Sequence, residues 1–298
     1  MPRIARLIGA LLPVLLLGQG CTTVPYTHRS QLMLMSESDD LQLGAAAYKE
    51  VLNKEKIAHD ARYTEPVQRV GRNIAAVAAK SEYQWEFTVI DDPKTANAFC
   101  LPGGKVAVYT GIFPYARDEA GLAAVIGHEV AHALARHGAE RMSRDTLAQV
   151  GAVGVAVAAG ASGAGSGTQQ AILQAYGLGS TIGIALPFSR SQESEADHIG
   201  LILMAKAGYD PHAAIALWKR MAAAEHGSAP PEWLSTHPAP STREQDLGNW
   251  MAETMSYFKA PGQPVAMLPQ VPGAPGAGDQ TVGANEPKYR RVRVAVGR

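Results

Sequence analysis

The sequence has few of the residues that build disulfide-stapled folds or nucleic-acid interfaces. It holds two cysteines, Cys21 and Cys100, among 298 residues, which excludes a framework of several disulfides. The 27 basic residues are balanced by 27 acidic ones, so nucleic acid is not an expected partner, because such binding requires a basic face. The N-terminal apolar run covers 11 residues, 7–17, whereas a bilayer-spanning helix needs about 20. We therefore expect a globular domain stabilised by its apolar core.

The first 20 residues have the composition of a targeting segment. Arg3 and Arg6 precede the apolar run, and small residues then lead to Cys21. This arrangement looks like a bacterial lipoprotein signal, in which Cys21 becomes the lipidated N-terminus, although Gly18 stands where leucine is usual. An ordinary secretory signal is the alternative. In either case residues 1–20 are expected to be removed and to take no part in the fold.

The remaining chain has the length of one domain with a substantial core. Residues 21–40 are polar and are predicted to tether the domain to a membrane, and residues 41–259 carry its helices and strands. Residues 260–298 begin with a Pro/Gly-rich stretch and are predicted to be a disordered tail. The stretch 146–189 lacks any charged residue. Its glycines and glutamines make it a poor membrane span, so small-residue helices packed on the domain are expected there.

The pattern of apolar residues predicts an α+β fold that is mostly helical. Residues 86–90 alternate and are rich in β-formers, which predicts a strand, and 97–111 reads as a β-hairpin around Pro102, Gly103 and Gly104. Helices are predicted over 41–53, 66–80, 118–136, 139–158, 192–207, 211–225 and 241–257.

The string at 127–132, GHEVAH, is the pattern with the most specific chemistry. Residues four apart on a helix lie on one face, so the imidazoles of His128 and His132 can reach one zinc ion. Glu129 can reach a water on that ion without binding the metal, and would act as general base in its attack on a carbonyl. A buried His and Glu on an apolar helix would need partners, and a metal supplies them.

A third ligand must come from elsewhere in the chain. One known pattern requires a histidine six residues after the second, but Gly138 stands there. His137 is one residue away, about 100° around the helix, so that pattern is rejected. We interpret His137 as a cation at the helix end.

A downstream carboxylate is the remaining source of the third ligand. Glu193 and Asp197 are four apart and share a helix face, whereas Glu195 points to the other side. Glu193 is predicted to bind the metal, and Asp197 to hold a ligand imidazole by its other nitrogen. A charged, solvated helix face is the alternative.

These residues together resemble the prenyl-protease/HtpX-like family of zinc metallopeptidases, the minigluzincins, and most closely its soluble, lipid-anchored bacterial branch. The likeness runs from about residue 41 to 257 and rests on four stretches: NAFCLPGGKVAVYTG at 97–111, HEVAH at 128–132, SRSQESEAD at 189–197 and THPAPSTR at 236–243. It implies one Zn²⁺ per chain held by His128, His132 and Glu193, with Asp197 in support, and a small sheet whose edge strand flanks the active-site helix.

The resemblance also implies roles for the hairpin and for a His-Pro loop. The strand 105–110 would be the edge that receives an extended peptide by β-augmentation, through Lys105, Val106, Ala107 and Val108. His237 would donate a hydrogen bond to the oxyanion or bind zinc in a closed resting state, and Arg243 would assist catalysis. A surface histidine in a turn is the alternative for His237.

The predicted function is a zinc-dependent endopeptidase that cleaves unfolded or misassembled envelope proteins. The alternative is a non-proteolytic, chaperone-like assembly factor whose zinc site is closed or structural, because a structural zinc has four protein ligands and a catalytic one keeps a position open. A zinc enzyme acting on a non-peptide substrate has no support in the motif. The leader predicts a location at the bacterial cell envelope, lipid-anchored at the outer membrane and facing the periplasm, where envelope assembly proteins are possible partners.

Overall fold

The computed structural model describes residues 21–158, 188–225, 231–238, 242–259 and 266–274. The predicted signal at 1–20, most of the uncharged stretch and the end of the predicted tail lie outside these ranges. Seven of the helices are α2 (Glu37–Lys54), α3 (Ala61–Val77), α5 (Glu119–Leu134), α6 (His137–Ala158), α8 (Arg190–Lys206), α9 (His212–Glu225) and α11 (Arg243–Met255). The predicted α+β class with a majority of helix is confirmed.

A three-stranded sheet stands at the centre of the fold, with strand order β3-β5-β4. Strand β4 (Ala98–Leu101) and β5 (Lys105–Tyr109) form the predicted antiparallel hairpin, and β3 (Glu86–Ile90) pairs with β5 in parallel. The hairpin turn contains Gly103 and Gly104, whose φ angles of 87° and 78° favour glycine. Because β5 has a partner on each side, it is the central strand, and the prediction that it is the edge is wrong.

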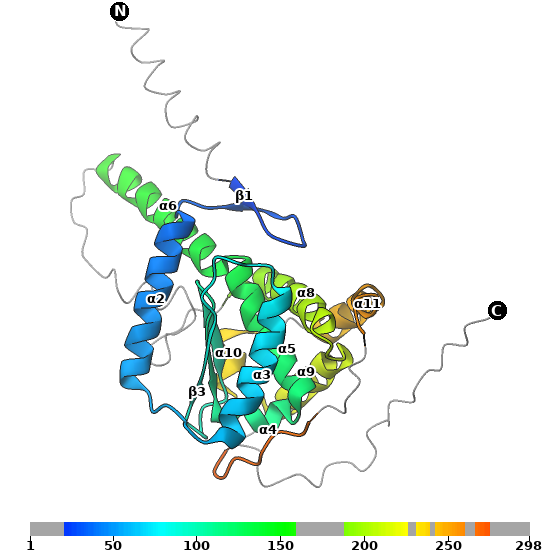
Figure 1. Ribbon diagram of the computed structural model, residues 1–298. Helices are drawn as coiled ribbons and strands as arrows, with labels where there is room; N and C mark the ends of the chain where they lie inside the picture. Colours follow the sequence, from blue (N-terminus) through cyan, green and yellow to red (C-terminus); the bar gives the residue numbers. More distant parts are fainter. Residues whose placement is uncertain (1–20, 159–187, 226–230, 239–241, 260–265, 275–298) are drawn as a thin grey trace, which may run out of the picture.

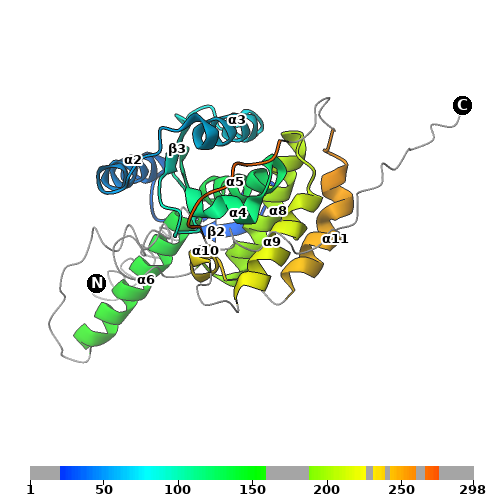
Figure 2. The same ribbon diagram turned by 90° about the horizontal axis from the view of Figure 1, so that it is seen from below.

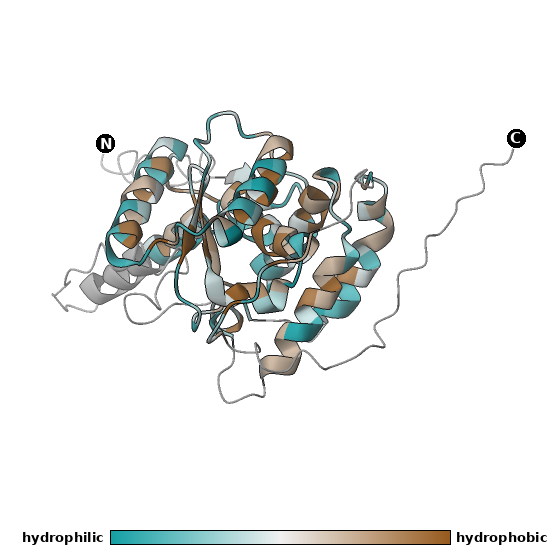
Figure 3. Ribbon diagram, turned by 60° about the horizontal axis from the view of Figure 1, so that its bottom comes forward, coloured by the Kyte–Doolittle hydropathy of each residue, from teal (hydrophilic) through white to brown (hydrophobic). Residues whose placement is uncertain are grey.

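Helices cover both faces of this sheet, as Figures 1 and 2 show. Side chains alternate along β5, so Val106 and Val108 enter the larger core, whereas Ala107 and Tyr109 enter a smaller one under α2. Helices α3 and α5 contribute to the larger core, and α8, α9 and α11 complete the molecule beyond α5. Apolar residues are accordingly concentrated in the sheet and on the helices that pack against it (Figure 3).

Helix α5 packs against this sheet, and every one of its residues is buried. The side chain of Asp118 caps its first turn by accepting a hydrogen bond from the Gly121 N–H, at 2.8 Å. Helix α8 crosses it closely where two glycines meet: a Cβ atom on Gly200 would lie 3.0 Å from the backbone nitrogen of His128. This glycine contact brings the two helices close together at the first histidine of the HExxH motif.

On both sides of the predicted domain, the described residues 21–40 and 266–274 are part of the fold. Strands β1 (Cys21–Thr23) and β2 (Ser30–Leu32) form an antiparallel hairpin, so residues 21–40 are not a free tether. Near the C-terminal end, Leu268 and Val271 are buried in the main core. The predicted boundary at 259 is therefore too early, because apolar residues beyond it pack in the core. In the described part of the chain, no helix has both the length and the hydropathy needed to cross a membrane.

Candidate active site

Three residues from α5 and α8 bring their donor atoms together at one point in the core. The Nε2 atoms of His128 and His132 lie 3.1 Å apart, since the two residues occupy successive turns of α5. Glu193 reaches them from the first turn of α8, with its carboxylate oxygens 3.4 Å from His128 Nε2 and 3.5 Å from His132 Nε2. Two ligands each about 2.1 Å from a tetrahedral zinc lie about 3.4 Å apart. The spacing and the donor chemistry therefore fit zinc.

His237 completes this cluster from the loop after the short helix α10 (Glu232–Thr236). Its Nδ1 atom lies 3.3 Å from His128 Nε2 and 3.1 Å from Glu193 Oε1. The candidate ligand atoms of all four residues fall within 4.8 Å of one another. None of the four residues is more than 4% exposed, so the cluster is closed to solvent.

Glu129 lies beside the cluster without taking part in it. The indole N–H of Trp233, on α10, donates a hydrogen bond of 2.7 Å to Glu129 Oε1, and His237 Nε2 lies 3.5 Å from the same oxygen. Burial raises the pKa of Glu129, although His237, His128 and the Trp233 hydrogen bond act in the opposite direction. A carboxylate with a raised pKa next to a metal site suits a general base.

Asp197 and Arg243 hold the ligands from behind. Asp197 Oδ1 lies 3.0 Å from His128 Nδ1, the ring nitrogen that faces away from the cluster. Arg243, at the start of α11, donates hydrogen bonds of 2.5 Å to Asp197 and 2.8 Å to Glu193, and its guanidinium lies 3.5 Å from the ring centre of Trp218. Arg243 thus contacts both carboxylates behind the cluster, and its catalytic role stays a prediction.

The charges of these residues favour a cation at the centre. Burial works against a proton on His128, but its hydrogen bonds to Asp197 and Glu193 outweigh burial and raise its pKa to about 9. For Glu193, burial is again opposed by the neighbouring histidines, above all His237, and its pKa falls well below the ordinary range. The acids thus stabilise a positive charge between them, which a divalent metal ion would supply.

The sequence prediction missed the contacts of three residues at this site: Trp233, Glu195 and His137. Trp233 had no motif to mark it. Glu195 does lie away from Glu193, but it is buried against His137, with Oε2 3.0 Å from His137 Nε2. His137 is fully buried, and burial lowers its pKa, so the prediction of a cation at the helix end is wrong. The short spacing of three acids on α8 was the available signal for Glu195.

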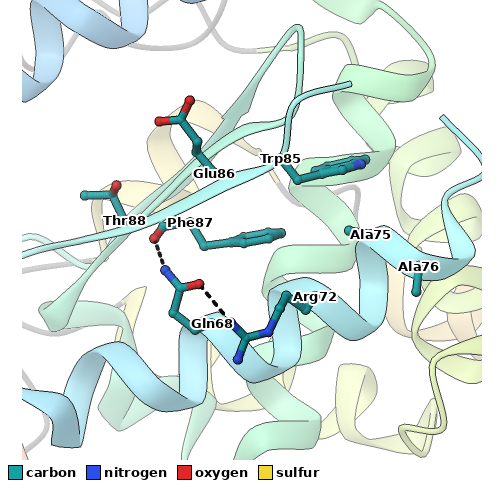
Figure 4. A pocket seen from close by; sticks show the side chains of 8 residues that line it. All are labelled: Gln68, Arg72, Ala75, Ala76, Trp85, Glu86, Phe87 and Thr88. Carbon is teal, nitrogen blue, oxygen red and sulfur yellow. Dashed lines mark hydrogen bonds between the residues drawn. The ribbon is translucent and has the colours of Figure 1, made fainter. Parts of the chain in front are cut away.

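The space next to the cluster is small. A cavity of about 20 Å³, lined in part by Glu129, His132 and Phe188, has room for about one water molecule. A larger hollow lies elsewhere in the described surface, between α3 and β3, with a volume of about 780 Å³ and a wall formed by Trp85 and Phe87 (Figure 4). None of the candidate ligands lines that hollow, so the hollow is separate from the buried cluster.

The edge strand next to the active-site helix is β4, not β5. Lys105, Val106, Ala107 and Val108 are paired on both sides, so they cannot add another strand. Just before β4, the backbone carbonyl of Asn97 accepts a hydrogen bond from the Tyr109 N–H across the hairpin, and backbone groups alternate in direction along an antiparallel strand. The backbone of Cys100 therefore points to the outer edge, and Cys100 also lines the small cavity beside Glu129.

Comparison with known proteins agrees with this geometry. Residues 61–251 match the family described as Peptidase family M48. The chain is 42% identical over 235 residues to the mitochondrial metalloendopeptidase OMA1 of Schizosaccharomyces pombe, covering 77% of this chain and 66% of the relative. It is 30% identical to the Saccharomyces cerevisiae OMA1 over 270 residues (82% and 75%) and 29% identical to the beta-barrel assembly-enhancing protease of Escherichia coli over 265 residues (82% and 52%).

These relatives contradict the predicted location at the bacterial cell envelope. Both OMA1 relatives carry names that place them in mitochondria, and one of them is 42% identical, whereas the Escherichia coli protein is 29% identical. The names likewise give no support to a lipid-anchored bacterial branch. Lipidation of Cys21, which is the first residue of β1, stays a prediction.

The match spans the HExxH helix, α8 and the loop after α10, which supply the cluster, and most of α11, which begins at Arg243. The predicted enzyme class is confirmed by the family and by the relatives that share it. The chain therefore belongs to peptidase family M48 and is a zinc metalloendopeptidase by class.

Proposed function

We propose that this protein hydrolyses peptide bonds at the cluster of His128, His132 and Glu193, with Glu129 as general base. The observation that carries the proposal is the position of Glu129: it adjoins three donors at zinc-ligand spacing and is held by Trp233 instead of binding in the cluster. A carboxylate kept apart from the ligands in this way has the place that proton transfer requires.

The residues of the site divide the work of the reaction. Zinc, when bound, supplies a Lewis acid and lowers the pKa of its water to about 7. Glu129 accepts the proton of the attacking water and later returns it to the leaving amine, and Oε2 is the available oxygen because Oε1 accepts the Trp233 hydrogen bond. Arg243 and Asp197 keep Glu193 and His128 in place.

His237 has two proposed roles that follow from its two nitrogens. Through Nδ1 it can act as a fourth ligand in a closed resting state, as its distances to His128 and Glu193 allow. After moving out, it can donate a hydrogen bond to the oxyanion, a contact worth about 3–4 kcal/mol in comparable sites. The movement would also open the buried cluster to a peptide.

We propose unfolded or misassembled polypeptides as the substrate class. Backbone pairing at an edge strand reads main-chain groups, which requires an extended segment and not a folded surface. The outer edge of β4 at Cys100 lies beside Glu129, so a strand added there would pass the cluster. Folded proteins rarely present extended segments, so this mode of binding would select unfolded polypeptides as substrates.

A second candidate function is that of a chaperone-like binder with a structural zinc site. It is favoured by the four-donor cluster, since a closed set of four protein ligands is typical of structural zinc. The two candidates differ in the effect of His237→Ala. A binder would lose zinc and gain no activity, whereas an enzyme with a closed resting state would retain zinc through its other three ligands.

The proposed function is tested by cleavage of reduced casein with the zinc-loaded wild type and with Glu129→Gln. Glutamine keeps the size of the side chain and an acceptor for Trp233, so the variant should bind zinc like the wild type. Its turnover should fall by at least about 100-fold, the lower range for loss of a general base. Equal cleavage by both proteins would refute the role of Glu129, and Glu193→Gln should lower zinc content if Glu193 is a ligand.

A further inference from the structure

The proposed mechanism does not use one buried series of hydrogen-bonded side chains, His132, His137 and Glu195, which begins at the predicted ligand His132. The Nε2 atom of His132 faces the cluster, while its Nδ1 atom lies 2.9 Å from Nδ1 of His137. His137 Nε2 in turn lies 3.0 Å from Glu195 Oε2. The side chains of His137 and Glu195 are 0% and 5% exposed, so water does not replace these contacts.

We propose that His137 is a positioning residue for the metal centre, and that Glu195 and the hairpin of residues 21–32 hold it in place. The inference rests on the zinc centre proposed above. It adds to that centre a second line of support, which reaches from a ligand through His137 to the N-terminal hairpin.

The protons in this series of hydrogen bonds have one consistent arrangement. A His132 ring that offers the Nε2 lone pair to a metal carries its proton on Nδ1, so His132 donates and His137 Nδ1 accepts. His137 must then carry its proton on Nε2, where Glu195 accepts it. The Glu195 carboxylate thus selects the His137 tautomer that can receive the proton of the ligand.

The other histidine ligand has the same kind of support over a shorter path. His128 Nδ1 meets Asp197 directly at 3.0 Å, whereas His132 reaches Glu195 through His137. Helix α8 therefore supplies three acids to the centre: Glu193 to the cluster, and Asp197 and Glu195 behind the two imidazoles. Carboxylates that fix a ligand imidazole in this way commonly change metal affinity by about 10–100-fold when removed.

The backbone is bent to place His137. Arg136 has a φ of 53°, which is unfavourable for a residue with a side chain, and it separates α5 from α6. The turn is secured from outside, because the Arg136 guanidinium donates hydrogen bonds to Asp40 (2.8 Å) and to the carbonyl of Met35 (3.1 Å). A strained turn held by such contacts is expected where a side chain must be aimed.

The hairpin 21–32 holds Glu195, the last side chain of this hydrogen-bonded series. Thr27 donates a hydrogen bond to Glu195 Oε1, and Arg29 bridges Glu195 and Glu140, at 2.8 Å from each. Tyr26 and His28, on either side of Thr27, have φ angles of 67° and 55°. Two residues in this unfavourable region within one short turn indicate that the contacts of Thr27 and Arg29 compensate for backbone strain.

The test is zinc affinity, measured on the full chain by competition with a chromophoric chelator. His137→Phe keeps a ring but removes both nitrogens, and should weaken zinc binding about 10–100-fold. His137→Gln keeps an acceptor and a donor and should restore most of the affinity. His198→Phe is the matched control, because His198 lies on α8 and pairs with Glu253 at 2.9 Å but points away from the centre.

Two further measurements separate positioning from folding. Arg29→Met leaves the ligands and His137 intact, and Arg29 is 30% exposed, so the variant should fold and still bind zinc more weakly than the wild type. The visible spectrum of the Co²⁺-loaded protein should change in His137→Phe and Arg29→Met, and stay unchanged in His198→Phe. A wild type that binds no zinc would refute the proposed function itself.

The inference is overturned if wild type, Arg29→Met and His137→Gln share one zinc affinity and one Co²⁺ spectrum with His137→Phe. If His137→Phe does not fold, the comparison of Arg29→Met with wild type decides: equal affinity and equal spectra then refute a link between the hairpin and His132.

Discussion

The substitution Gly200→Ala tests whether the contact between α5 and α8 sets the geometry of the metal centre. A Cβ atom at 200 would lie 3.0 Å from the His128 nitrogen and 3.1 Å from the Gly127 carbonyl carbon, and ordinary contact begins at 3.4 Å. Backbone atoms of α5 cannot rotate away, so the helices must separate by a few tenths of an ångström. Metal–ligand distances tolerate about 0.2 Å. The added methyl group should therefore pull Glu193 away from His128 and His132.

The expected cost has two parts. Overpacking of a core costs about 1–3 kcal/mol of unfolding free energy, and replacing a helical glycine returns about 0.5–1 kcal/mol. Gly200→Ala should thus lower the unfolding free energy in urea by up to about 2.5 kcal/mol and weaken zinc binding at least tenfold. Gly248→Ala, on the exposed face of α11 with no atom within 4 Å, should be neutral or stabilising. The reasoning fails if the two variants have the same stability and the same zinc affinity.

Three further predictions concern single residues. Trp233→Phe removes the hydrogen bond to Glu129, so kcat on casein should fall about tenfold while zinc content stays constant; an unchanged kcat would exclude the orienting role. Burial acts to raise the pKa of Glu140, but hydrogen bonds from Arg29 and Gln192 outweigh it and lower that pKa. The contribution of Glu140 to the unfolding free energy should therefore be complete above about pH 4.5 and be lost as the pH falls below it. Urea titrations of wild type and Glu140→Gln should accordingly converge in acid. Burial raises the pKa of Cys100, so it should resist iodoacetamide until unfolding, as peptide mapping would show.

The parts of the site that follow from local periodicity were predictable from the sequence. His128 and His132 had to share a helix face, and Glu193 and Asp197 had to share another, because four residues make about one turn. The hairpin around Gly103 and Gly104 was equally local. These elements are found at nearly the predicted positions in α5, α8 and β4–β5.

The parts that depend on partners distant in sequence were not predictable in this way. The hairpin pattern predicted two strands correctly but did not show that β3 joins β5 in parallel, and this pairing moved the edge from β5 to β4. His137 looked like a helix-end cation because its partner Glu195 is 58 residues away. Residues 21–32 looked like a tether because their fixed contacts, such as Arg29 with Glu140, are with distant helices.

The alternating acids of α8 have an evolutionary consequence. Glu193, Glu195 and Asp197 serve three different groups within two turns. Inserting or deleting one residue among them would rotate everything downstream by about 100° and break several of these contacts in a single event. Changes of length should therefore be tolerated at connecting loops far more often than within this pentapeptide, and chains descended from a common ancestor should keep its spacing even where the acids themselves are exchanged.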